Sequence, residues 1–177
     1  MKRVAMRLKA MRIIDKSFTT APKSYIIQSF LAVVVLAIIL YFVEVLTHAA
    51  IVAALGASTF VVFAMPYSII ALPRRLIGGH VIGVIAGTFC YYIFIGGPLG
   101  KLITGWEFAT LAVYALAVGL AIFLMTISNT EHPPAASTAL GIVAHEWSYQ
   151  VVIFVLLCAV CLAIVRRLLR GHLKDLV

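Results

Sequence analysis

The chain has 177 residues, of which 64% are hydrophobic and 11% are charged, and its mean hydropathy is +1.13. No soluble domain of this size needs so much apolar surface, so an all-α polytopic membrane helix bundle is expected. The formal net charge is +8, and the basic residues gather at positions 1–23 and 166–174. This clustering indicates the cytoplasmic side of a membrane protein rather than nucleic-acid binding.

Residues 1–23 form a basic segment, which we expect to lie on an anionic membrane surface. The segment lacks the separate apolar core and the cleavage site of a signal peptide. The apolar run over 24–46 follows and is long enough to cross a bilayer with some tilt. Glu44, near the end of this run, is expected at the membrane interface.

The second apolar run, over 48–65, is shorter and carries the small residues Gly-Ala-Ser-Thr at 56–59 in its middle. Pro66 ends the run, because proline cannot continue a helix interior. A short or broken membrane helix, with a half-helix start at 56–59, is therefore expected here.

Two basic residues, Arg74 and Arg75, come before a full-length apolar run over 76–95. Glycines at positions 79, 83 and 87 share one face of this helix. They predict the close approach of another backbone, either within the chain or from a second copy in a homo-oligomer.

Trp106 opens the next full-length run, over 106–128, and is expected to anchor it at the membrane interface. The last run, over 148–165, ends at two arginines. Together with the runs over 24–46 and 76–95, these make four full-length spans, so the two shorter helices bring the number of membrane segments to six.

The stretch Glu-His-Pro-Pro-Ala-Ala-Ser-Thr-Ala-Leu lies at 131–140, between the last two long runs. Proline is favoured in the first turn of a helix, so Pro133 and Pro134 predict a helix start that continues to about Ala144. The free N–H groups of the next three residues would point back toward His132. Inside a membrane, that geometry makes an anion site.

The basic residues also bear on topology. If all six segments cross the membrane, every basic residue except Lys101 faces one side, as the positive-inside rule favours. If the two short segments are re-entrant loops instead, Arg74 and Arg75 fall on the opposite side. We therefore expect one transmembrane domain over 24–169 and a tail over 170–177, in an inner (plasma) membrane with both termini cytoplasmic.

The small-residue groups at 56–59 and 135–138 are 79 residues apart, and each lies between two full-length runs. Three segments per repeat is an odd number, so repeats over 24–96 and 106–169 would be inverted relative to each other. Inverted repeats with short or broken helices are an architecture of transporters.

Three cysteines, Cys90, Cys158 and Cys161, lie inside apolar runs. The last two have the spacing of a redox pair, but they lack the helix start or basic neighbours that stabilise a thiolate. All three are expected to be small packing residues.

Several motifs in this order resemble the HPP family of integral membrane proteins, which is named for its His-Pro-Pro triplet. The motifs are Gly-Ala-Ser-Thr at 56–59, Pro-Arg-Arg at 73–75, Ile-Gly-Gly-His at 77–80, His-Pro-Pro-Ala at 132–135 and Thr-Ala-Leu at 138–140. The resemblance extends over about 24–165. It departs from the family pattern at 135–138, which reads Ala-Ala-Ser-Thr in place of Ala-Gly-Ala-Thr, and in the six segments counted against the four helices usually described.

Chloroplast and cyanobacterial members of the family are associated with nitrite transport, so the resemblance implies a transporter or channel for nitrite or a similar small anion. Burying such an anion needs hydrogen-bond donors and positive charge. We expect the binding residues to supply hydroxyls, imidazoles and helix starts: Gly56, Ser58, Thr59, His80, His132, Pro133, Pro134, Ala135, Ser137 and Thr138. Arg74 and Arg75 could gather anions at the inner entrance. No cofactor or metal is expected.

Each of these residues also has a structural interpretation. Serine and threonine in membrane helices commonly bond to a carbonyl one turn back. His80 could be a packing donor beside the glycines, and the two arginines could act only as a topology signal.

Two other function classes remain open. A membrane metalloenzyme could use Glu131, His80, His132 and His145, although no pair of them has the i, i+4 spacing of a helical metal site, and no enzyme is expected. The other class is a membrane scaffold or sensor subunit.

Overall fold

The computed structural model describes residues 21–41 and 49–177, and all regular structure in these ranges is helical. The elements are α3 (Pro22–Tyr41), α4 (Ala49–Ala64), the 3-10 turn η2 (Ile69–Ala71), α5 (Pro73–Cys90), the π-helical turn η3 (Tyr91–Ile95), α6 (Gly100–Thr104), α7 (Glu107–Ile127), α8 (Pro134–Val143) and α9 (Tyr149–Leu169). The predicted surface segment before residue 21, Glu44 and the end of the first run lie outside the described residues.

Three helical stretches are long and apolar enough to cross a membrane: Pro73–Ile95, Glu107–Ile127 and Tyr149–Leu169. They match three of the four predicted full-length spans. The fourth, over 24–46, begins as α3 and continues past the described residues, so its full length stays a prediction.

The predicted helix break at 56–59 is wrong. These residues lie in the middle of α4, one continuous helix of 16 residues with a length of about 24 Å. An interior position has its backbone N–H groups bonded within the helix, so no half-helix starts there. The inverted repeat loses its matching pair of helix starts and remains only a prediction.

The predicted helix start at the proline pair is confirmed. Pro133 caps α8, Pro134 is its first residue, and Ala144 follows the last. With 10 residues, about 15 Å, α8 covers only half of a bilayer core.

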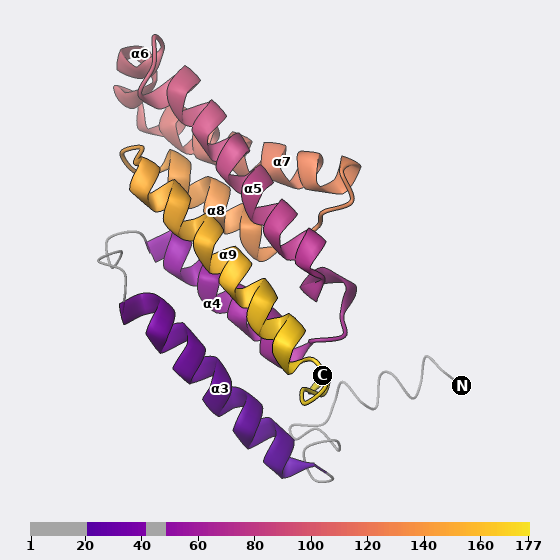
Figure 1. Cartoon of the computed structure of the whole chain (residues 1–177). Coiled ribbons are helices and arrows are strands. Elements are labelled where there is room, and N and C mark those ends of the chain that lie inside the picture. The colour runs from indigo at the N-terminus through magenta and orange to yellow at the C-terminus, as the bar shows by residue number, and fades with distance from the viewer. Residues whose placement is uncertain (1–20, 42–48) are drawn as a thin grey trace, which may run out of the picture.

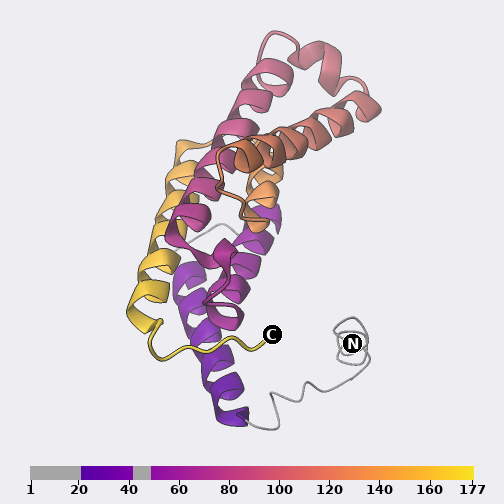
Figure 2. The same cartoon turned by 90° about the vertical axis from the view of Figure 1, so that its right-hand side faces the viewer.

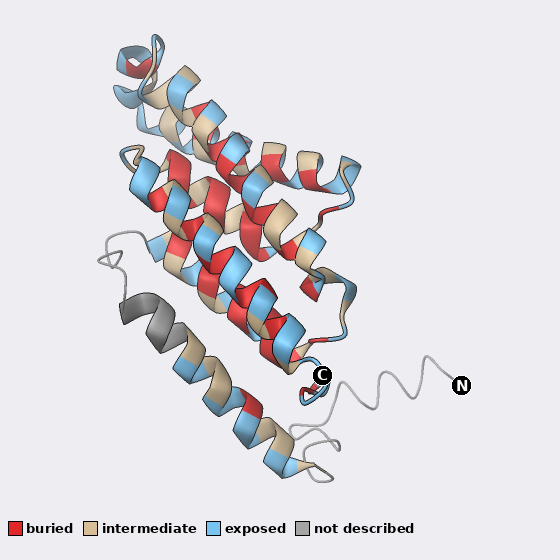
Figure 3. Cartoon of the chain, in the orientation of Figure 1, coloured by how far each residue is buried: buried red, intermediate tan, exposed pale blue. Residues whose placement is uncertain are grey.

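Helix α8 lies at the centre of the bundle. It packs against α5, α4 and α7, and α9 runs alongside α4 and α5 (Figures 1 and 2). Most of α8 is buried (Figure 3), whereas the buried residues of α7 form a single stripe spaced by about four: Val113, Ala117, Ala121 and Met125. The exposed apolar side chains on the rest of α7 suit contact with lipid.

Glycines on one face of α5 allow α8 to come close, as the sequence predicted. A Cβ placed on Gly79 would lie 2.6 Å from the Cβ of His132, and one on Gly87 would lie 2.7 Å from the Ala139 carbonyl oxygen. A Cβ on Gly83 would overlap the carbonyl oxygen of Ala135. The glycine face therefore serves packing within the chain.

The end of α4 meets the start of α3 and the segment after α9. The Phe63 carbonyl accepts a bond from Gln28 of α3 at 2.5 Å, and the Ala64 carbonyl accepts one from the N–H of Leu176 at 2.8 Å. The guanidinium of Arg166 donates to the Pro66 carbonyl at 2.5 and 2.9 Å. The start of α3, the end of α4 and the end of α9 therefore lie at one end of the bundle.

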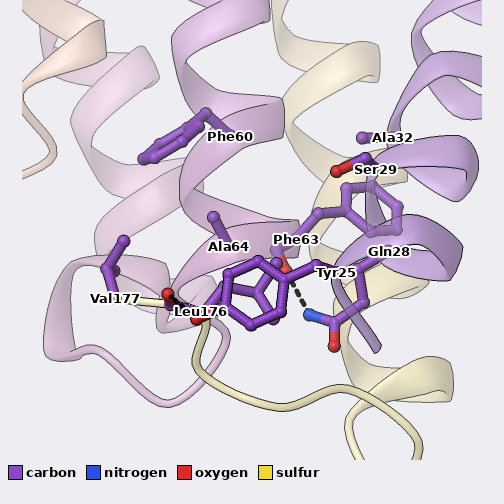
Figure 4. Close-up of a pocket in the computed structure, with 9 residues that line it drawn as sticks. All are labelled: Tyr25, Gln28, Ser29, Ala32, Phe60, Phe63, Ala64, Leu176 and Val177. Atoms are coloured by element: carbon purple, nitrogen blue, oxygen red, sulfur yellow. Dashed lines mark hydrogen bonds between the residues drawn. The ribbon is translucent and has the colours of Figure 1, made fainter. Parts of the chain in front are cut away.

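A pocket of about 230 Å³ lies at this junction (Figure 4). It is lined by α3, α4 and the last residues described: Tyr25, Gln28, Ser29, Ala32, Phe60, Phe63, Ala64, Leu176 and Val177. Tyr25 closes one side of the pocket by donating to the Leu176 carbonyl at 2.6 Å. The lining is mostly apolar and holds the segment after α9 against α3.

The three cysteines are free thiols. Cys90 and Cys158 are buried in the bundle, as expected of packing residues, whereas Cys161 is exposed on the outer face of α9. The predicted packing role therefore holds for two of the three.

Candidate functional site

Two histidines share one serine hydroxyl in the interior of the bundle. The Ser58 Oγ lies 3.0 Å from Nε2 of His80 and 2.9 Å from Nε2 of His132. On the other side of His80, its Nδ1 lies 2.9 Å from Oγ1 of Thr138. All four side chains have no exposed surface. We call these four residues the histidine cluster.

Three helices position the cluster. Ser58 comes from the buried face of α4, and Thr138 comes from the second turn of α8. His80 belongs to α5, beside the glycines that bring α8 close. His132 precedes α8, and its Nδ1 lies 2.9 Å from the Ile70 carbonyl oxygen of η2, which fixes the ring. Ser58 and His132, both among the expected binding residues, therefore meet in the interior of the bundle.

The contact to Ile70 determines which ring nitrogen of His132 carries the proton. A carbonyl oxygen can only accept, so Nδ1 of His132 carries a proton and donates it. In the neutral ring, Nε2 therefore has a lone pair directed at Ser58.

The histidine cluster lies off the middle of the span. His80 is the eighth residue of the stretch Pro73–Ile95, so it lies about 10 Å from the start of a helix that is about 34 Å long. The cluster is thus nearer the Arg74 end of α5 than the helix centre.

An open surface pocket of about 440 Å³ borders the histidine cluster. Its walls come from α4, η2 and the start of α8: Ala57, Phe60, Val61, Ile70, Pro133, Pro134 and Ser137. Three of these residues are sequence neighbours of cluster members, and Ile70 bonds to one of them. The half-buried hydroxyl of Ser137 is the polar side chain in this lining.

The predicted anion site at free N–H groups is wrong in its details. The N–H of Ala135 donates to the His132 carbonyl at 2.9 Å, and the N–H of Ala136 donates to the Pro133 carbonyl at 3.1 Å. The tight first turn thus uses two of the three donors that were expected to face an anion.

Two other predicted residues stand apart from the histidine cluster. Thr59 donates to the Leu55 carbonyl of its own helix at 2.8 Å, the structural alternative given above for membrane hydroxyls. Gly56 has open space where a Cβ would be. Neither residue contacts His80 or His132 through a bond found in the structure.

The two arginines differ from each other. Arg75 is half-buried, forms an ion pair with Glu131 and also donates to the Asn129 side chain. Arg74 is exposed, with a long contact of 3.4 Å to the Ser128 carbonyl. Arg75 therefore ties α5 to the segment before His132, and Arg74 is the one available to attract an anion.

Sequence reasoning missed the carbonyl of Ile70, because a backbone acceptor leaves no mark in a side-chain pattern. The flanking prolines, Pro66 and Pro73, were the available signal, since they predict a non-helical segment between two helices. Pairing of Glu131 with Arg75 was also missed, because 56 positions separate the two residues.

The metal-site hypothesis gains no support from the geometry. His80 and His132 are together, but His145 lies beyond α8, where its Nδ1 is 3.1 Å from the Gly141 carbonyl. Within the described ranges, no three histidine, cysteine, aspartate or glutamate side chains are placed to hold one ion.

Comparison with known proteins gives one family and two relatives. The family model described as HPP, transmembrane region, matches residues 19–173. A transmembrane protein of Dictyostelium discoideum is 35% identical over 85 residues, 48% of this chain and 27% of the relative. Another transmembrane protein of the same organism is 31% identical over 115 residues, 64% of this chain and 34% of the relative. The chain matches only about a quarter to a third of the length of these curated relatives. No solved structure matches the chain.

Proposed function

This chain belongs to the HPP family of transmembrane proteins, and we propose that it conducts a small inorganic anion across the membrane, with nitrite as the first candidate. One observation carries the proposal. Inside an apolar bundle, two buried histidines share a hydroxyl beside a pocket of about 440 Å³. Ionisable groups within membrane bundles are expensive to bury and usually belong to a substrate or proton pathway.

The pocket supplies one side-chain donor, the hydroxyl of Ser137. His132 is bonded to the Ile70 carbonyl and precedes Pro133 in the sequence, and both of these residues line the pocket. With so few donors the anion would be held weakly, and a weak site suits conduction because the ion must leave again. At about 30 Å³ for each water, a volume of about 440 Å³ is the share of roughly 15 waters, so a partly hydrated anion fits.

The distribution of charge supports an orientation. Among the described residues, every lysine and arginine except Lys101 belongs to the start of α3, the start of α5, the end of α9 or the segment after it. Under the positive-inside rule these parts are cytoplasmic. Arg74 would then attract anions at the cytoplasmic end of α5.

A flux assay tests the function. We expect purified protein in liposomes to accelerate the entry of nitrite over that of chloride, with nitrate and formate measured in parallel. Liposomes without protein, held at pH 7 or above, correct for uncharged nitrous acid that crosses lipid unaided. Equal rates with and without protein for all four anions would contradict the proposal and favour a scaffold or sensor subunit.

A labelling experiment tests the orientation. In a cysteine-free background, Arg74→Cys should resist an impermeant thiol reagent added to intact cells, whereas Lys101→Cys should react. Both positions are exposed, so access depends on the side of the membrane. The opposite pattern would reverse the orientation, and labelling of both would mean that the stretch Pro73–Ile95 does not cross.

A further inference from the structure

We propose that Ser58 joins His80 and His132 into one proton-binding unit, which takes up a single proton with each anion. The first part rests on geometry alone. The second part, coupling to an anion, rests on the proposed function.

The hydroxyl of Ser58 has one proton and three partners. Besides the two Nε2 atoms, its Oγ lies 2.9 Å from the Ala54 carbonyl oxygen, one turn back in α4. A serine hydroxyl can donate to only one of these three partners, and it can accept only from a ring nitrogen that carries a proton, because a carbonyl oxygen does not donate. The position of this single proton therefore decides the state of both rings.

In the neutral state the hydrogen bonds run in one direction. Thr138 donates to Nδ1 of His80, and Nε2 of His80 donates to Ser58. Ser58 donates to Nε2 of His132, whose Nδ1 donates to the Ile70 carbonyl. Each ring is a neutral tautomer with one donor and one acceptor, so the whole network is satisfied.

A second state uses the same atoms. When a proton from hydronium forms an N–H bond at Nε2 of His132, water is released and no bond of the protein breaks. The O–H of Ser58 turns from His132 to the Ala54 carbonyl, and its oxygen then accepts from both rings. Because the Ala54 carbonyl is already in place, no heavy atom has to move.

The cluster holds one proton and not two. The ring centroids of His80 and His132 are 5.3 Å apart. Two imidazolium ions at that separation in an apolar interior would repel strongly. A second proton is therefore excluded over the pH range in which the cluster binds the first.

The elements packed around the cluster carry few ionisable side chains. Helices α4 and α8 and the turn η2 carry no ionisable side chain. On α5, Arg75 is paired with Glu131, Arg74 is exposed and contacts the Ser128 carbonyl, and Cys90 is buried in the last turn. The remaining packed helices, α7 and α9, carry these ionisable groups: Glu107, Tyr114, Tyr149, Cys158, Cys161, Arg166 and Arg167. Of these, Arg166 is bonded to Pro66 at the end of α9.

Protonation would place a positive charge next to the pocket. His132 is bonded to Ile70 and precedes Pro133, and both of these line the pocket wall. A monovalent anion in the pocket neutralises the charge, so the two are bound more tightly together than separately. Proton and anion would then cross as a neutral pair.

Proton binding can be measured without transport. With His48, His145 and His172 changed to asparagine, only the two cluster histidines remain, and nitrogen NMR of the ¹⁵N-histidine-labelled protein in nanodiscs reports each ring. At pH 8 we expect the proton of His132 on Nδ1 and that of His80 on Nε2. On acidification to pH 4, one ring should become imidazolium while the other stays neutral. The proposal of a single proton-binding unit would be overturned by two imidazolium signals, by none, or by the reverse tautomers.

Ser58→Ala tests the shared hydroxyl, with Thr59→Val as the matched control on the same helix. Loss of the oxygen that accepts from the charged ring should lower the midpoint of protonation by about one pH unit, a tenfold loss of proton affinity. Thr59→Val should leave the midpoint unchanged. An unchanged midpoint in the serine variant would show that the two histidines act separately.

Coupling is tested in liposomes with an internal pH dye. We expect one proton to enter with each nitrite, at a rate that does not respond to membrane potential. Nitrite flux that carries net charge would overturn the coupling while leaving the proposed function intact. A single-proton titration without flux of any anion would instead refute the proposed function and leave the proton unit standing.

Discussion

The two small-residue segments, 56–59 in α4 and 135–138 in α8, have nearly the same composition and different roles. In α4 the serine reaches across to two histidines, and the threonine bonds to its own helix. In α8 the serine lines a pocket, and the threonine reaches across to His80.

This difference follows from position in the helix rather than from residue type. Segment 56–59 is in a helix interior, and its serine faces α5 and α8. Segment 135–138 opens a helix after two prolines, so the same residue types fall on different faces relative to the neighbours. A hydroxyl pair in a membrane helix is therefore assigned a role only when its face is known.

The largest difference in the free energy of unfolding is expected between the variants Gly83→Ala and Gly56→Ala. A Cβ at position 83 overlaps the Ala135 carbonyl, so α5 and α8 must separate, at a cost of about 1–3 kcal/mol in the free energy of unfolding. At position 56 the space is open, and alanine should stabilise the helix by about 0.5–1 kcal/mol. Unfolding in detergent measures both. Equal stability of the two variants would contradict the close contact on α8.

A smaller difference in the free energy of unfolding is expected between the variants Thr138→Val and Thr59→Val. Thr138→Val leaves Nδ1 of His80 without a buried partner, and should cost about 1–2 kcal/mol of unfolding free energy. Thr59→Val removes only a bond within its own helix and should change stability by less than about 0.5 kcal/mol. The same unfolding assay gives both values. If Thr59→Val proved the more damaging, the assignment of faces would be reversed.

The smallest effect is expected at Ser137. Ser137→Ala removes a half-buried hydroxyl from the pocket wall, so folding should be unchanged, while the affinity for nitrite should fall by about fivefold, or 1 kcal/mol. Concentration dependence of the liposome flux measures this, with Ala136→Gly on the same helix as a control for backbone stability. Unchanged affinity would place the anion away from this pocket.

Local signals in the sequence predicted much of the fold. The proline pair gave the start of α8 because proline fixes its own backbone angle, and the glycine spacing gave the face on which α8 packs. The break expected in α4 was wrong because Gly56 alone weakens a helix without ending it.

For the histidine cluster, the sequence allowed its residues to be selected but not the contacts between them. His80, His132, Ser58 and Thr138 could be selected, because polar groups in an apolar chain need partners. Their connections could not be predicted, since the bond to Ile70 uses a backbone carbonyl, and the order around Ser58 depends on how three helices cross.

The hydrogen bonds that satisfy the carbonyls at the end of α4 have a consequence for folding during synthesis. The carbonyls of Ala64 and Pro66 are bonded by Leu176 and Arg166, which the ribosome adds 100 or more residues later. At about 5–20 residues per second, α4 spends on the order of 5–20 s with this end open. Bare carbonyls are tolerated in water and not in hydrocarbon, so during that interval this end must stay at the membrane surface. Helix α9 and the segment after it therefore complete α4, and a pause in translation before position 166 would prolong the time in which α4 is incomplete.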